Sequence, residues 1–187
     1  MIQKNISLTI SLFLFLSNIF HLEIKSQSGN DYEDLLLFLV NEEYKDCYNK
    51  SIKYTLKDKT KKDALPYLFA SKASFEMSRD HQYTEEFPKA YKTAMSFAAK
   101  YRKKDKEYLY KEDAEEYIDN FKMIIIEDIE NYILEGTIKT YGKAVSLAKK
   151  TSDMDPQDYG AKLLYALLCT LTKNNSKAKE VLKICMP

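Results

Sequence analysis

The sequence contains no tryptophan, and residues that interrupt helices are scarce: in 187 residues there are four glycines and four prolines. A shortage of both favours long helices joined by short turns. The glycines, at positions 29, 136, 142 and 160, lie too far apart to form a glycine-rich phosphate-binding loop. We therefore predict an all-α fold without strands.

Residues that carry catalytic or metal chemistry are also few. Beyond residue 28, His81 is the only histidine, and no G-x-S-x-G motif or C-x-x-C pair occurs. We interpret His81 as a solvated loop residue. We expect no catalytic residues, no metal site and no cofactor, and the protein is predicted not to be an enzyme. One acidic cluster could bind a cation or act in acid–base chemistry, but we interpret it as a solvated helix face: Glu112, Asp113, Glu115 and Glu116.

The first 28 residues have the pattern of a signal peptide. Lys4 is followed by an apolar run from Ile6 to Phe20, about fifteen residues, which is short for a membrane span. Ser26 and Ser28 supply the small residues of a cleavage site. We predict a signal peptide over residues 1–28 and a mature domain over 29–187, secreted or periplasmic, with no stable membrane span. An uncleaved anchor is the alternative.

The mature chain is electrically balanced. The full sequence has 29 basic and 28 acidic residues, and removal of Lys4, Lys25 and Glu23 with the signal leaves 27 of each. A neutral chain has no general attraction to nucleic acid, so we expect no nucleic-acid partner. Two local basic clusters are interpreted as solvated helix ends: Lys57, Lys59, Lys61 and Lys62, and Lys100, Arg102, Lys103 and Lys104.

Apolar residues recur at three- and four-residue steps through most of the chain, which predicts amphipathic helices. Asn41-Glu42 is the expected break in the first segment, Asp63 the expected cap of the second, and Gly136 the expected stop of the longest helix. Cys169 and Cys185 fall in successive helices, where either a disulfide or two buried thiols fit. The expected helices cover 31–57, 64–78, 84–104, 107–135, 140–152, 157–172 and 176–185.

Small residues recur at one fixed distance near the C-terminus. Ala144 and Ala178 are 34 residues apart, each follows a lysine, and Ala166 and the pair Asp155-Pro156 lie between them. This layout resembles the tetratricopeptide repeat, a helix–turn–helix unit of 34 residues, most clearly over residues 140–185. The resemblance implies a short right-handed α-solenoid of about three helical hairpins, with a leading helix and one long central helix. It also implies a non-catalytic interaction module or scaffold of the cell envelope or extracellular space.

In such a repeat protein the first helices of the hairpins line a concave, partner-binding face. Here that face would include Tyr67, Ser71 and Ser74 from one helix and Leu163, Leu167 and Thr170 from another. Hydroxyls beside tyrosine and leucine suit a protein or peptide partner held by apolar contacts and a few hydrogen bonds. The other interpretation is that Leu163 and Leu167 belong to the core.

Two further hypotheses concern apolar residues. The segment Met123–Ile126 is apolar most of the way round a helix, so the alternative function is a small secreted domain that binds an apolar ligand in a cavity there. No capping helix follows residues 176–185. We therefore expect an exposed apolar end around Leu171, Val181 and Ile184 that is available for self-association.

Overall fold

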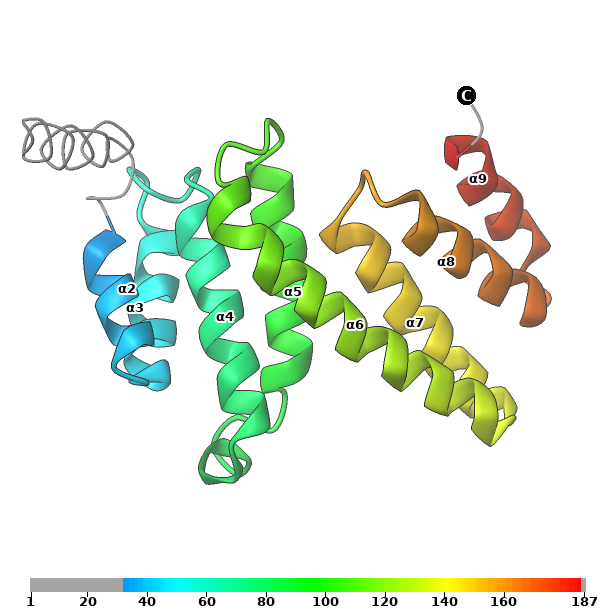
Figure 1. Ribbon diagram of the computed structural model, residues 1–187, viewed down its shortest axis with the longest axis horizontal. Helices are drawn as coiled ribbons and strands as arrows, with labels where there is room; N and C mark the ends of the chain where they lie inside the picture. Colours follow the sequence, from blue (N-terminus) through cyan, green and yellow to red (C-terminus); the bar gives the residue numbers. More distant parts are fainter. Residues whose placement is uncertain (1–31, 186–187) are drawn as a thin grey trace, which may run out of the picture. The chain divides into compact units, whose positions relative to one another are not determined.

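A computed structural model describes residues 32–185, so the predicted signal segment lies outside the described residues. The chain divides between Asp34 and Leu35, and the account that follows concerns the part from Leu35 onward. This part is all-helical, and residues 32–185 contain no strand. The helices are α2 (Glu33–Val40), α3 (Tyr44–Leu56), α4 (Leu65–Arg79), α5 (Ala90–Lys104), α6 (Lys111–Glu135), α7 (Ile138–Met154), α8 (Tyr159–Leu171) and α9 (Asn175–Cys185), with one 3-10 turn, η2 (His81–Tyr83) (Figure 1).

Most helix ends have a local cause. The predicted break after α2 is confirmed, because Glu42 adopts a left-handed conformation with φ of 60° and the chain turns into α3. Gly136 ends α6 with φ of 67°, as expected of a glycine stop. Thr137 and Thr140 form reciprocal side-chain-to-backbone hydrogen bonds at the start of α7. Asp63 is not the cap of α4, since Ala64 occupies that position without a side-chain hydrogen bond.

Two predicted helix starts were wrong. The helix expected from residue 84 begins at Ala90, because Pro88 keeps the preceding Phe87 out of the helical conformation. The helix expected from residue 107 begins at Lys111. Buried Asp105 holds the preceding loop by accepting hydrogen bonds from the backbone N–H of Leu109 at 2.7 Å and from the Tyr101 hydroxyl at 2.7 Å.

Successive helices fold back on one another, and most pack against their neighbours in sequence (Figure 1). The pairs in contact are α3–α4, α4–α5, α6–α7, α7–α8 and α8–α9, and α5 also packs against α7 although α6 separates them in the chain. Aromatic side chains join α6 to α4, with Phe121 4.5 Å from Phe75 between ring centroids. The Tyr91 hydroxyl of α5 donates to Asp128 of α6 at 2.6 Å.

Alanine occupies the places where the helices meet. Ala144, Ala166 and Ala178 are all buried, as the 34-residue spacing predicted. Ala70 and Ala73 of α4 are buried as well, opposite α5. A methyl side chain lets two helix backbones approach closely, where a larger residue would hold them apart. Among the described residues, none of the helices is both long and apolar enough to cross a membrane.

Two glycine substitutions should move stability in opposite directions. Alanine at Gly136 has room, since its Cβ would meet nothing nearer than 3.9 Å, but the left-handed backbone strains it. Gly136→Ala is expected to destabilise the fold by about 1 kcal/mol. Gly142→Ala lies inside α7 with open space around it and should stabilise by about 0.5–1 kcal/mol. Urea unfolding measures both values, and equal signs for the two variants would contradict this assignment.

Candidate functional site

An exposed apolar stripe runs along α8. Tyr159, Leu163, Leu167 and Leu171 follow one another at intervals of four residues, and their side chains are 57%, 49%, 57% and 54% exposed. Residues spaced by four lie on one face of a helix. Because large apolar side chains rarely gather on the surface of a soluble protein, this stripe is the strongest candidate for a binding surface in the described part of the chain.

The opposite face of α8 packs in the core, and this explains why the stripe is exposed to solvent. Tyr165, Leu168 and Cys169 are buried against α7 and α9, the two helices that pack on α8. Asp158 fixes where the helix begins, because its carboxylate accepts a hydrogen bond from the backbone N–H of Ala161 at 2.9 Å. With its register fixed in this way, α8 turns one apolar face into the core and the other to solvent.

The stripe ends at a hollow of about 260 Å³ between α7 and the end of α8. Ile138 and Tyr141 of α7 line one side, and Leu171, Thr172 and Lys173 line the other. Ile138 is 93% exposed, so the hollow has an apolar rim. An apolar side chain of a partner that lies along α8 could enter here.

The predicted site residues on α8 are thus at the surface. Leu163, Leu167 and Thr170 are exposed, so the interpretation of the two leucines as core residues is wrong. Thr170 contributes less than expected, because its hydroxyl donates to the carbonyl of Ala166 at 3.1 Å within the same helix. Recognition at this face would therefore depend mainly on apolar contact.

The predicted site residues on α4 are placed differently, and two of them need correction. Ser71 and Ser74 are fully buried, so neither lies on an exposed binding face. The Ser71 hydroxyl donates to the carbonyl of Ala94 at 2.7 Å and lies 2.7 Å from the Tyr117 hydroxyl, because α6 folds over this face of α4. Tyr67 is half-buried, and its hydroxyl donates to the carbonyl of Lys61 at 2.9 Å. The α4 residues therefore do not continue the α8 surface.

The remaining apolar predictions have mixed outcomes. Ile125 is buried but Met123 is 68% exposed and Ile126 38% exposed, which does not suit the lining of an enclosed cavity. At the C-terminal end, Leu171 and Ile184 are exposed as expected, whereas Val181 is buried.

One residue of the basic clusters departs from the expectation of a solvated helix end. Lys100, Lys103 and Lys104 are exposed at the end of α5, but Arg102 is buried rather than solvated. Its Nε donates to the carbonyl of Met154 at 3.3 Å, and its guanidinium lies 4.3 Å from the centre of the Tyr108 ring. Arg102 therefore connects the C-terminal end of α5 to the C-terminal end of α7.

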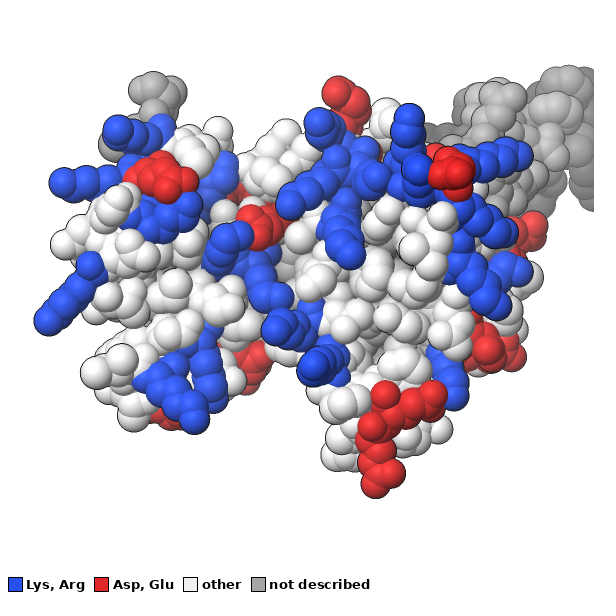
Figure 2. Space-filling model, turned by 180° about the vertical axis from the view of Figure 1, so that it is seen from behind, with Lys and Arg blue, Asp and Glu red and all other residues white. Residues whose placement is uncertain are grey.

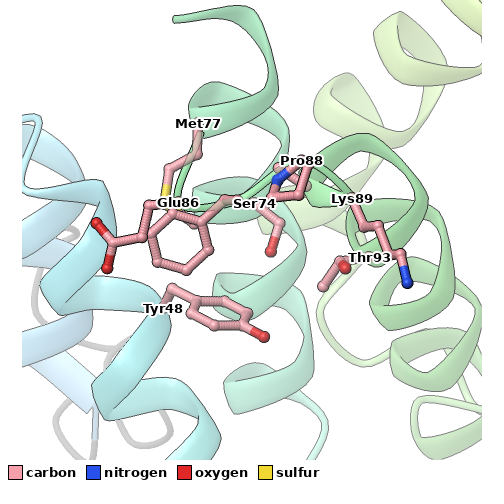
Figure 3. Close-up of a pocket in the computed structure, with 9 residues that line it drawn as sticks. Tyr48, Ser74, Met77, Glu86, Pro88, Lys89 and Thr93 are labelled. Carbon is pink, nitrogen blue, oxygen red and sulfur yellow. The ribbon is translucent and has the colours of Figure 1, made fainter. Parts of the chain in front are cut away.

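A second hollow, of about 290 Å³, lies between α3, α4 and the loop before α5 (Figure 3). The side chains of Tyr48, Phe87 and Pro88 make it largely apolar, and buried Ser74 lines it. The Ser74 hydroxyl has no hydrogen-bond partner among the described residues. This hollow was not predicted from the sequence, because Phe87 and Pro88 were expected to lie inside a helix. The residue before a proline in fact signals a helix boundary.

Cys169 and Cys185 are not joined in a disulfide. Within residues 32–185, histidine, cysteine and acidic side chains nowhere gather in a group that could hold a metal ion. His81 lies exposed in η2, which agrees with a solvated loop residue.

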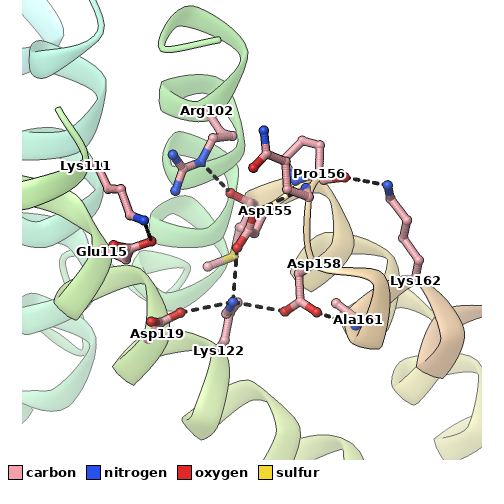
Figure 4. Close-up of polar contacts among 12 residues, drawn as sticks. Arg102, Lys111, Glu115, Asp119, Lys122, Asp155, Pro156, Asp158, Ala161 and Lys162 are labelled. Atoms are coloured by element: carbon pink, nitrogen blue, oxygen red, sulfur yellow. Dashed lines mark hydrogen bonds and ion pairs between the residues drawn. The ribbon is translucent and has the colours of Figure 1, made fainter. Parts of the chain in front are cut away.

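A cluster of charges ties α6 to the start of α8 (Figure 4). The Lys122 ammonium lies 3.0 Å from Asp119, 3.2 Å from Asp155 and 3.0 Å from Asp158. Burial would lower the pKa of Lys122, but its hydrogen bonds to Asp158 and Asp119 outweigh burial and raise that pKa. Within the acidic cluster near the start of α6, Glu115 forms an exposed contact of 3.2 Å with Lys111.

Asp158 serves both as the cap of α8 and as a partner of Lys122. Burial raises the pKa of its carboxyl, but the hydrogen bonds from Ala161 and Lys122 outweigh burial and hold that pKa below the ordinary value of 3.8. A carboxylate that accepts several hydrogen bonds is stabilised in its charged form. The cluster is therefore a structural connection, in which three carboxylates share one ammonium group.

Removing the central cation of the cluster should be costly. Lys122→Met leaves Asp119, Asp155 and Asp158 facing one another without a counter-charge, with the Lys122 side chain only 13% exposed. We expect destabilisation by about 2 kcal/mol, between the values for surface and fully buried pairs. Lys111→Met removes an exposed pair and should cost less than about 0.5 kcal/mol. Urea unfolding near neutral pH compares the two, and equal costs would refute the buried role of Lys122.

The lowered pKa of Asp158 predicts a pH dependence. Its charged form contributes stability that is fully present above the unfolded pKa, near 3.8, and is lost as pH falls through the lower folded pKa. The asparagine introduced by Asp158→Asn can still cap a helix, so the comparison isolates the charge. The stability difference between the unaltered chain and Asp158→Asn should be constant at mildly acidic pH and shrink toward about pH 2. A difference that stays constant would contradict the assignment.

Comparison with family models, with curated proteins and with solved structures finds no match. The resemblance to tetratricopeptide repeats stays a prediction, which rests on the spacing of Ala144, Ala166 and Ala178 in the sequence.

Proposed function

We propose that the chain is an exported, non-catalytic interaction module of the tetratricopeptide-repeat type, which holds a protein or peptide partner along the apolar stripe of α8. The observation that carries this proposal is the half-exposure of Tyr159, Leu163, Leu167 and Leu171 on one helix face. The proposed place of action is the cell envelope or the extracellular space, after removal of residues 1–28.

The repeat interpretation is supported by how the helices pair. In the proposed arrangement α4–α5, α6–α7 and α8–α9 are three successive hairpins of a short right-handed solenoid, and α3 leads them. Contact between α5 and α7 fits this scheme, because second helices of neighbouring hairpins lie side by side in such an array. The length of α6, 25 residues, departs from the family pattern and makes it the long central helix.

The chemistry of the stripe indicates the kind of partner. Its side chains are aliphatic and aromatic, and Thr170 already uses its hydroxyl within α8. An amphipathic segment with apolar residues at three- or four-residue steps would match the stripe and place one side chain in the hollow beside Ile138. The exposed ends at Leu171 and Ile184 suit self-association as a second use of this end of the chain.

The proposal predicts that peptides selected against the full chain from a displayed library bind through α8. The double variant Leu163→Ser, Leu167→Ser should weaken their binding by about tenfold or more, since each lost leucine contact is worth about 1 kcal/mol. The matched control is Leu56→Ser, Leu109→Ser, two leucines that are 75% and 77% exposed elsewhere. It should change binding by less than about twofold, and thermal unfolding should be alike in both variants.

Two outcomes would count against the proposal. One is a selection that yields no peptide above background. The other is peptide binding that survives loss of both α8 leucines or falls equally in the control variant. Sedimentation of the full chain separates self-association from partner binding, because a dimer formed through α8 would also dissociate in the α8 variant.

A further inference from the structure

A basic hollow lies between α5 and α7, apart from the apolar stripe of α8. Its volume is about 300 Å³. Its floor includes Met95 and Ala99 of α5 and Ser146 of α7. Its charged lining consists of Lys100 and Lys103 from α5 and Lys149, Lys150 and Asp153 from α7.

The positive charge of this surface is set by the composition of two helices. No acidic residue occurs in α5, and Asp153 is the only one in α7. The acidic residues are concentrated on α6, which reads KEDAEEYIDNFKMIIIEDIENYILE. A chain with almost no net charge therefore contains two predominantly basic helices, α5 and α7, and Figure 2 shows many lysine and arginine side chains on the face seen from behind.

Nearby negative charges do not neutralise the lysines of the hollow. Asp153 pairs with Lys149 at 2.7 Å. No ion pair joins Lys100, Lys103 or Lys150 to another residue within the described range. The ends of α5 and α7 add the negative ends of two helix dipoles, each equivalent to about half an elementary charge. Four ammonium groups outweigh one carboxylate and roughly one further negative charge, so the hollow stays positive.

The lysines repel one another at short range. Burial lowers the pKa of Lys150, and the nearby charges of Lys92 and Lys149 lower it further, although Asp153 opposes them. Burial is the largest cause of this lowered pKa, and the neighbouring lysine charges add to it. A bound anion would relieve this repulsion, and the anion would be desolvated by the walls of the hollow.

We propose that the hollow between α5 and α7 binds a small ligand that carries two or more phosphoryl groups. Lysine binds phosphate as a point charge, and four lysines around one hollow can contact several phosphoryl oxygens at once. The volume lies at the lower end for small-molecule sites. An α-helix is about 10–12 Å across with its side chains, so an acidic helix is too wide to enter.

Calorimetric titration of the full chain with tripolyphosphate tests the proposal. We expect saturable binding that weakens with added salt, as multiple charge contacts require. Lys100→Gln with Lys150→Gln should weaken it by about tenfold or more, because two of the four ammonium contacts are lost. The control, Lys53→Gln with Lys179→Gln, removes the same charge from positions on α3 and α9 outside the hollow and should change binding by less than about twofold.

A second measurement needs no variant. Acetylation of lysines on the unaltered chain, followed by mass spectrometry, should show Lys100, Lys103 and Lys150 protected by tripolyphosphate while Lys53 and Lys179 react as before.

Vesicles of phosphatidylcholine with and without phosphatidic acid identify the source of the phosphoryl groups. Binding only to the acidic vesicles, in competition with tripolyphosphate, assigns a lipid headgroup. Tripolyphosphate binding without vesicle binding assigns a free phosphorylated molecule.

Several results would overturn the proposal. They are the absence of tripolyphosphate binding, equal losses in the two variant pairs, and equal protection of all lysines. Hexaglutamate that binds as tightly as tripolyphosphate would show attraction by charge alone. An oligothymidine that binds more tightly than tripolyphosphate, with loss in the same variant, would assign the surface to nucleic acid instead. None of these variants touches α8, so failure here is separate from failure of the proposed peptide binding.

Discussion

Close approach of helix backbones, made possible by alanine, is the constraint on which the rest of the structure depends. Ala144, Ala166 and Ala178 are buried where α7, α8 and α9 meet their neighbours. A larger side chain at such a position forces the helices apart or shifts them, because protein interiors have little free space. These alanine-mediated helix contacts also determine which face of each helix is exposed to solvent. The apolar stripe of α8 and the basic hollow between α5 and α7 both follow from them.

The sequence predicted the elements whose signals are local. Gly136 as a left-handed stop and the break near Glu42 each depend on a few neighbouring residues, and the structure agrees with both. The burial of the alanines was predicted from their 34-residue spacing, and the structure agrees with it as well. Helix starts at α5 and α6 were harder to predict. There the outcome depended on Pro88 and on Asp105, whose side chain organises a loop several residues away.

The candidate site was predictable only in part, for a related reason. The repeat resemblance implied that Leu163, Leu167 and Thr170 lie on a partner-binding face, and they are exposed. The same resemblance could not show that α6 covers α4, which buries Ser71 beneath Tyr117. Arg102 was misjudged in the same way, since its burial depends on Met154 and Tyr108 in other parts of the chain. Contacts between segments distant in sequence are what a single sequence shows least.

The double role of Asp158 has a consequence for how the chain opens. Its carboxylate closes the first turn of α8 and also contacts Lys122 in the middle of α6. The first turn of α8 therefore cannot fray as an isolated helix end, because fraying would also break a contact with a helix more than thirty residues earlier in the chain. The amide hydrogen of Ala161, which donates to this carboxylate, is therefore protected by a contact that also involves α6, so opening of the first turn of α8 is coupled to α6.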